Sequence, residues 1–360
     1  MDPLTFKFGW VDQQGRESGF FAKKGEVNEA DLILDKTVIP LGGIYSVVHR
    51  YNRLGITYQA DRGPVTTTVA VHGGKEQEIK QMIDRLCSYR WTENRHEQLV
   101  KDGQGAAFRT AKCRLCTAVV DLTGFADTPQ FYCPYCECIL NSNYEIEQHM
   151  DRYRLCDRCG FFGWPIRYRT TYFILNLIQW REHLSCHVCM RRECWKMMIG
   201  NVLPPFIGMA YAIWQTVRAY AAGTLDPRFP DLVRANALAQ KKRAAEAEAV
   251  YQGMLDRTPV QAGLRYNLAL ANAKAGGWER CLDFAQESLD DCSNYTPAAN
   301  LMMQAFQALG RPADAYRVGE FWGKVTAAPP PASLERGHDQ ATREQIQTRP
   351  SAGGSDIWRK

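Results

Sequence analysis

The sequence has 360 residues, of which 45% are apolar, so it can bury packed cores and is not a wholly disordered protein. Its 44 basic and 39 acidic side chains leave a net charge of +5, which falls short of the strongly basic balance of many nucleic-acid-binding proteins. The first residues contain neither a basic region nor an apolar run, so no secretory signal is predicted and we expect a cytoplasmic protein. A chain of this length predicts several domains.

Residues 1–99 are predicted to form a β domain that ends in one helix. Short β-rich runs recur between glycine-containing turns, and apolar residues then recur at helical spacing in Lys75–Trp91. This order of elements resembles a pleckstrin-homology-like (PH-like) barrel, and a generic small β-barrel is the alternative. The resemblance implies binding of phosphoinositides or protein segments, although no compact cluster of basic residues accompanies it. The predicted strands are Leu4–Val11, Gly19–Ala22, Asp31–Leu34, Tyr45–Tyr51, Gly55–Gln59 and Val65–Val71.

Residues 100–108 are predicted to be a linker, and a block rich in cysteine follows. Eleven of the 13 cysteines lie from Cys87 to Cys194, and eight of them form four Cys-x-x-Cys pairs. In a reducing compartment such pairs indicate metal ligands rather than disulfides. A two-residue spacer lets a tight turn aim two thiolates at one ion, and two such turns complete a tetrahedral Zn²⁺ site. The predicted ligands of two structural zinc ions are Cys113, Cys116, Cys133, Cys136, Cys156, Cys159, Cys186 and Cys189.

The spacing of these pairs resembles two zinc ribbons, at residues 109–145 and 150–195. Each ribbon is too small to fold on its own core, so the metal would supply folding free energy. We favour sequential pairing, first with second and third with fourth, and the alternative is interleaved pairing. The long gap in the second ribbon holds Ile166–Trp180, which is rich in β-branched and aromatic residues and predicts a hairpin or a long strand.

Further cysteine and histidine side chains lie near the pairs. Cys138 and Cys194 are each either an exchanged ligand or a spare buried thiol. His183 and His187 flank the last pair and are expected outside the first coordination shell, while Cys87 is predicted to be a buried apolar residue. Cys-x-x-Cys pairs also serve thiol–disulfide redox chemistry, which stays an alternative although no βαβ context accompanies the pairs.

The second ribbon carries most of the charge imbalance. Residues 151–200 hold nine basic and four acidic side chains, and arginines alternate there with aromatic residues. Arginines on phosphates and aromatic rings on bases are typical of single-stranded nucleic-acid binding, and the alternative is that the rings form the core of the ribbon. The residues concerned are Arg152, Tyr153, Arg154, Arg158, Phe161, Phe162, Trp164, Arg167, Tyr168, Arg169, Tyr172, Trp180, Arg181, Arg191 and Arg192.

Residues 196–222 contain an uncharged run, Met197–Val217, between Lys196 and Arg218. Two consecutive prolines predict that this run is broken into two helices, at Met197–Leu203 and Phe206–Ala222. Three hypotheses compete for the run. It is a core segment that docks the ribbon, an interfacial membrane element, or, least favoured, a true membrane span. For a membrane element, the interface anchors would be Trp195, Tyr211 and Trp214.

Residues 230–323 show a 34-residue period. Ala247, Cys281 and Ala315 are separated by this interval, as are Gly276 and Gly310. The period resembles that of tetratricopeptide repeats (TPR), which implies three helical hairpins and a concave groove that binds extended segments of partner proteins. The alternative is a structural array that seals the zinc domain. If the resemblance holds, the groove is faced by Arg265, Asn267, Asn272 and Lys274.

Residues 325–360 are rich in proline and polar residues and are predicted to be disordered. Elsewhere the sequence lacks a phosphate-binding glycine loop, a metalloprotease helix motif and a nucleophile elbow. The sequence therefore predicts a multidomain α+β protein that is a non-catalytic adaptor and binds a protein partner through its repeats. The alternatives are a nucleic-acid-binding protein, a thiol–disulfide redox protein and a membrane-peripheral assembly factor.

Overall fold

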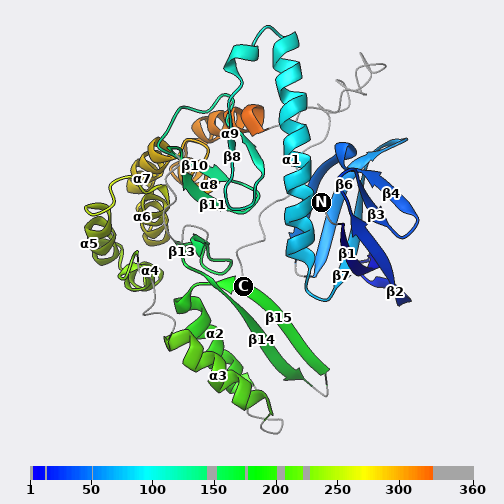
Figure 1. Cartoon of the computed structure of the whole chain (residues 1–360). Helices are drawn as coiled ribbons and strands as arrows, with labels where there is room; N and C mark the ends of the chain where they lie inside the picture. Colours follow the sequence, from blue (N-terminus) through cyan, green and yellow to red (C-terminus); the bar gives the residue numbers. More distant parts are fainter. Residues whose placement is uncertain are drawn as a thin grey trace.

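The computed structural model describes residues 3–12, 14–50, 52–143, 152–174, 177–200, 207–221 and 228–326. An N-terminal sheet with a long helix lies on one side, and an arc of helices from the C-terminal half lies on the other (Figure 1). Small pairs of strands lie between them, inside the arc. Almost all of the predicted disordered tail, and the two consecutive prolines of the uncharged run, lie outside the described residues.

The N-terminal domain is one antiparallel sheet in the order β4-β3-β2-β1-β7-β6-β5. The strand pairs in the described part of the chain do not join β4 to β5, so the sheet is open and not the closed barrel that was predicted. The 3-10 turn η1 (Leu41–Gly43) stands between these two edge strands, and α1 (Glu76–Lys101) packs against η1 and β5. The strands are β1 (Leu4–Val11), β2 (Glu17–Val27), β3 (Asp31–Leu34), β4 (Thr37–Pro40), β5 (Ile44–Arg50), β6 (Arg53–Ala60) and β7 (Gly63–His72).

The helix α1 is longer than predicted and replaces the start of the expected linker, which then forms the short turn η2 (Gly105–Ala107). Its first half buries Ile79, Ile83 and Cys87 in the core of the sheet domain. Its middle reaches the first cysteine module, because the Ser88 hydroxyl accepts a hydrogen bond from the Val119 amide at 3.0 Å. The helix therefore connects the sheet domain to the cysteine-rich region directly.

The cysteine-rich region consists of short antiparallel strand pairs followed by two helices. The strands β14 and β15 form the hairpin that Ile166–Trp180 predicted, although the hairpin continues to Ser185. The elements are β8 (Thr110–Lys112), β9 (Val119–Asp121), β10 (Gln130–Cys133), β11 (Cys138–Asn141), β12 (Arg154–Leu155), β13 (Phe162–Gly163), β14 (Ile166–Ile174), β15 (Leu177–Ser185), α2 (His187–Gly200) and α3 (Ile207–Ala221).

The C-terminal helices form three consecutive antiparallel hairpins, which confirms a helical repeat. The turns between paired helices contain Lys242, Gly276 and Gly310, with φ angles of 60°, 87° and 70°. These residues are spaced by the 34-residue period, so lysine adopts at one turn the left-handed conformation that glycine adopts at the other two. The helices are α4 (Leu232–Gln240), α5 (Ala244–Leu255), α6 (Ala262–Ala275), α7 (Trp278–Asp291), α8 (Thr296–Ala308) and α9 (Pro312–Thr326).

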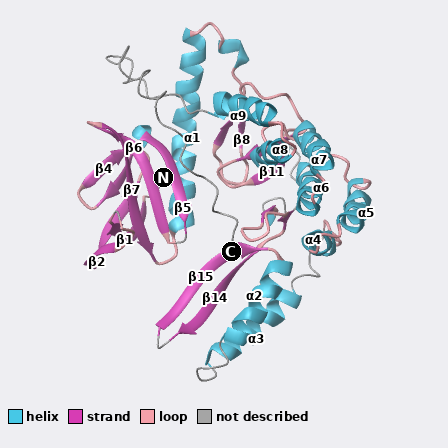
Figure 2. Cartoon of the chain, turned by 180° about the vertical axis from the view of Figure 1, so that it is seen from behind, coloured by secondary structure: helices cyan, strands magenta, loops and turns pink. Residues whose placement is uncertain are grey.

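The repeats and the cysteine-rich region share one hydrophobic core. Rings and aliphatic side chains from β10 to β13 are buried among residues of α4 to α8. Seen from behind, the short strands again lie on the inner side of the helical arc (Figure 2). The residues contributed by the cysteine-rich region to this core are Tyr132, Ile139, Tyr153, Phe161 and Phe162.

Candidate metal centres

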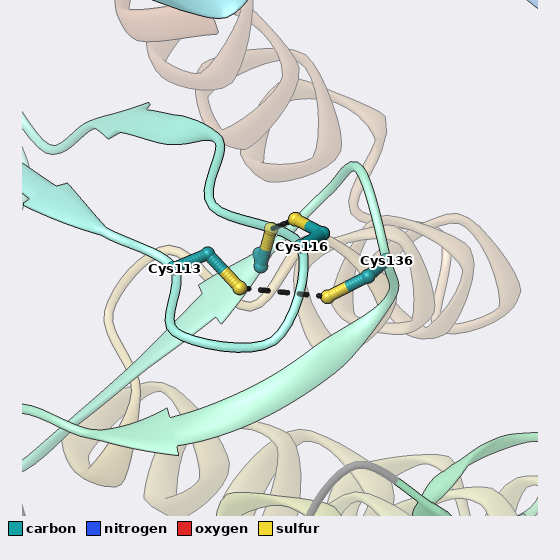
Figure 3. A group of neighbouring side chains, drawn as sticks. Cys113, Cys116 and Cys136 are labelled. Atoms are coloured by element: carbon teal, nitrogen blue, oxygen red, sulfur yellow. Dashed lines mark hydrogen bonds between the residues drawn. The ribbon is translucent and has the colours of Figure 1, made fainter. Parts of the chain in front are cut away.

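The first cysteine group joins the β8–β9 turn to the β10–β11 turn. The four Sγ atoms of Cys113, Cys116, Cys133 and Cys136 lie within 4.8 Å of one another. The distances from Cys113 to Cys136 and from Cys116 to Cys133 are both 3.6 Å, too long for a disulfide bond of about 2.05 Å. Four sulfurs at about 2.3 Å from a central Zn²⁺ would stand about 3.8 Å apart. The labelled sulfurs converge on a common point in Figure 3, so the group fits a tetrahedral ion.

Both turns of the first group have the same backbone conformation. The amides of Thr117 and Glu137 each donate a hydrogen bond of 2.8 Å to the carbonyl of the cysteine four residues earlier. Both residues have positive φ angles, 64° and 60°. This left-handed residue turns the chain back after each Cys-x-x-Cys pair, which is how the sequence directs two thiols to the same side.

The second group uses one turn of this kind and one helix. The Sγ atoms of Cys156, Cys159, Cys186 and Cys189 also lie within 4.8 Å of one another. Gly160 repeats the left-handed turn, with φ of 77° and a 2.9 Å hydrogen bond to the Cys156 carbonyl. Cys186 instead directly precedes α2, whose first turn carries Cys189. Thiolates at a helix N-terminus are stabilised by the helix dipole, and the sequence did not reveal this helical start.

The structure therefore groups the eight predicted cysteines in sequential order, first pair with second and third pair with fourth. Interleaved groups do not occur among the described residues. An ion held by such a group would cross-link two chain segments, and four thiolate ligands would complete its tetrahedral coordination.

Hydrogen bonds to sulfur surround the second group. The Cys186 amide donates to the Cys156 sulfur at 3.3 Å, and the Gln240 side-chain amide approaches the Cys186 sulfur at 3.9 Å. Gln240 is the last residue of α4, so the first repeat helix directly contacts the second cysteine group. Contacts of this kind orient ligands and keep them in place.

Burial and mutual hydrogen bonding set the proton affinities within each group. The pKa of Cys113 and the pKa of Cys156 are both lowered, because the other three thiols of the group hydrogen-bond to that sulfur. The pKa of Cys133 and the pKa of Cys159 are raised, because these thiols keep their protons to donate hydrogen bonds to the neighbouring sulfurs and because both are largely removed from solvent. Without a cation, one thiolate per group forms most easily, and metal binding would release the remaining protons.

The nearby cysteines lie outside both groups. Cys138 is buried, and its thiol donates to the Cys136 carbonyl at 3.4 Å. Cys194 is buried between α2 and α3, and Cys87 in the sheet core, where burial raises the pKa of its thiol to about 12. Burial and Arg191 lower the pKa of His187 to about 4. His183 lies on β15, and its side chain is outside the described part of the structure.

The aromatic residues of the basic block lie largely inside the protein. Tyr153, Phe161, Phe162 and Tyr168 are all buried, as expected for rings that form the core of a module. Arg152 stacks on Trp164 at 4.9 Å. These four buried rings are thus packed against the chain itself, while Trp164 is only half-buried.

The side chains of two asparagines in the repeats bind backbone groups of the two cysteine modules. The Asn294 amide accepts a hydrogen bond from the Tyr132 N–H at 2.7 Å and donates one to the Tyr132 carbonyl at 2.7 Å. The Asn267 amide does the same for Phe162, at 2.7 and 2.8 Å. Each asparagine thus forms hydrogen bonds with both the backbone N–H and the backbone carbonyl of a buried aromatic residue, as a neighbouring β-strand would.

The predicted groove residues are therefore engaged within the chain. Asn267 binds Phe162, and the Lys274 ammonium lies 5.7 Å from the Phe161 ring. Arg265 pairs with Asp291 at 2.7 Å, and Asn272 donates to a carbonyl of its own helix. Asn294 was not predicted, because an asparagine between two helices is an ordinary turn residue and nothing in its neighbourhood distinguishes it.

No protein-family model matches this chain, and a search of the curated proteins found no match.

Proposed function

We propose that the chain is a non-catalytic adaptor in which two structural Zn²⁺ ions and TPR-like repeats stabilise a single rigid unit. The pair of asparagine contacts with Tyr132 and Phe162 is the observation that supports this proposal best. Both contacts are buried, and a shared core surrounds them. In this proposal the zinc ribbons occupy the inner face of the repeats as an extended ligand would, and the PH-like sheet domain is attached through α1.

A protein partner then binds the outer surface of the repeats and not the filled inner face. The last helix, α9, supports this choice, because its Tyr316 side chain is 72% exposed. Tyrosine is enriched among the side chains that contribute most of the binding energy at protein–protein interfaces.

Deleting residues 230–323 cannot test this proposal, because the deletion would also uncover the core of both zinc ribbons. We therefore propose quantitative affinity capture with the full-length, zinc-loaded chain and with two point variants. Tyr316→Glu should lose the partner, while Phe21→Glu, at an exposed position of β2, should retain it. Equal capture by both variants would refute binding through the last repeat.

The zinc content tests the structural part independently. The expected result is two zinc ions per chain and eight thiols that react only after chelation. Less than one zinc per chain, with several thiols reacting at once in the native protein, would instead favour thiol–disulfide chemistry.

A further inference from the structure

The helices α2 and α3 carry apolar side chains on their outer side. Ile199 is 73% exposed and Val217 is 62% exposed, in a region where the opposite side of both helices is fully buried. The Trp195 indole approaches the Tyr220 hydroxyl at 3.4 Å, so the outer sides of the two helices are continuous. We call this surface the hairpin face; it comprises Trp195, Ile199, Ile213, Trp214, Val217 and Tyr220.

Basic residues border the hairpin face. The Arg191 guanidinium lies 4.5 Å from the Tyr220 ring, and the Arg218 guanidinium lies 5.7 Å from the Trp214 ring. Residues 191–218 contain four basic side chains and one acidic side chain, and the latter, Glu193, is paired with Lys196 at 2.8 Å. The Arg191 guanidinium donates to the Ala219 carbonyl at 3.2 Å, so the start of α2 and the end of α3, which carry these charges, lie together. Residues 197–217 between them in the sequence are uncharged.

A second hairpin lies beside the first. Both views show that β14 and β15 extend from the cysteine-rich region in the same direction as α2 and α3, away from the repeats (Figures 1 and 2). Both helices contact β14. The part of this hairpin farthest from the metal group is also uncharged, since residues 170–180 contain no acidic or basic residue and end at Arg169 and Arg181. The β14–β15 hairpin and the α2–α3 pair thus extend side by side in the described part of the chain, and in the sequence each uncharged run is preceded and followed by arginine or lysine.

We propose that this end of the molecule docks on the surface of a bilayer that contains anionic lipids. Tryptophan and tyrosine favour the interface between lipid headgroups and acyl chains, and bordering basic residues are attracted to anionic headgroups. Within the described ranges no helix is long and apolar enough to cross a membrane. In this proposal the hairpin face lies at the level of the lipid headgroups. Charge complementarity favours lipid over a second copy of the chain, because two copies would bring the same cations together.

Vesicle binding by the zinc-loaded, full-length protein tests this proposal. The protein should cosediment with phosphatidylcholine vesicles that contain phosphatidylserine, and more weakly with vesicles of phosphatidylcholine alone. Ile199→Glu and Trp214→Glu should each weaken binding about tenfold or more, since each removes a side chain that would leave water. Arg218→Glu should weaken binding to the anionic vesicles only. Unchanged zinc content and circular dichroism would show that the variants fold.

Phe21→Glu is the control, because it removes an exposed ring from β2, outside both proposed binding surfaces, and should leave vesicle binding unchanged. If the wild-type protein binds neither the vesicles with phosphatidylserine nor those without it, the proposal is overturned. Equal binding by all four variants also overturns it, because the protein would then reach lipid through another surface. If Trp214→Glu converts a dimer into a monomer and the wild type binds no vesicles, the hairpin face joins two copies instead. None of these outcomes bears on partner capture by α9, so the two proposals are tested separately.

Discussion

The two cysteine modules dock on the same array of repeats in different ways. The first module meets ends and connections of helices: Gln130 accepts a hydrogen bond from the Ala262 amide at 3.0 Å, and Asn294 precedes α8. The second module meets the faces of helices, where Asn267 also donates to Asn236 at 3.2 Å and Asn236 donates to the Phe162 carbonyl at 3.2 Å. The second module is therefore part of the interior of the repeats, while the first is fastened to one edge of them.

Removing one ligand from each metal group should give the largest difference between the modules. Cys113→Ser and Cys156→Ser should each lower the zinc content from two ions per chain to one. Zinc binding contributes about 10–16 kcal/mol to the folding of small zinc peptides, so either loss should unfold its own module. Because the second module fills the core of α4 and α6, Cys156→Ser should also lower the melting temperature of the repeats, measured by helical circular dichroism. Equal melting of the two variants would contradict the comparison.

The two asparagine contacts should differ in the opposite direction, with the greater cost at the first module. Asn294→Leu leaves the N–H and carbonyl of Tyr132 without partners, which costs about 2–6 kcal/mol at about 1–3 kcal/mol for each buried group. Asn267→Leu leaves the Phe162 N–H without a partner, but the Phe162 carbonyl keeps its Asn236 donor, so the cost should be smaller. Denaturant unfolding in excess zinc measures both. A larger loss of stability for Asn267→Leu would contradict this expectation.

The spacing of residues was sufficient to predict both cysteine groups and the helical repeats. A Cys-x-x-Cys turn is a local structure, and its left-handed residue needs only local hydrogen bonds, as at Thr117 and Glu137. The 34-residue period likewise led to the turns at Gly276 and Gly310, and the structure adds Lys242 in the same conformation. Such features depend on neighbours in the sequence, which is why they could be predicted from it.

The docking of the modules could not be predicted, because it depends on contacts between distant residues. Tyr132 and Asn294 are 162 positions apart, and neither residue type marks such a pair. The open sheet has a similar origin: the strands were predicted from local alternation, but whether the edge strands β4 and β5 pair depends on contacts between distant residues, and α1 packs against β5 and η1. The short edge strand β4 was missed, since it has four residues and ends in proline.

A smaller effect tests the close approach of the second module to α6. A Cβ atom on Gly263 would lie 2.6 Å from the Phe162 ring, which is buried and cannot move freely. Gly263→Ala should therefore destabilise the protein by about 1–3 kcal/mol through overpacking. Gly253→Ala in α5 is the control: a Cβ there meets nothing within 4 Å, and the change should stabilise the helix by about 1 kcal/mol. Denaturant unfolding of the two variants should give shifts of opposite sign.

The smallest expected effect compares the turns that close the Cys-x-x-Cys pairs. Glu137 in the first module and Gly160 in the second occupy equivalent positions, with φ angles of 60° and 77°. A residue with a Cβ atom pays about 1–2 kcal/mol in this conformation, so Glu137→Gly should stabilise the first module by about 1 kcal/mol. Gly160→Ala should destabilise the second module by a similar amount through backbone strain, because its Cβ would meet Leu270 only at an ordinary 3.6 Å. Competition with a zinc chelator measures each module, and zinc retention should rise for the first variant and fall for the second. If Gly160→Ala retains zinc as the wild type does, the buried contacts of the second module outweigh the strain in its turn. Zinc affinity would then depend on the interior position of that module rather than on the backbone conformation of the turn.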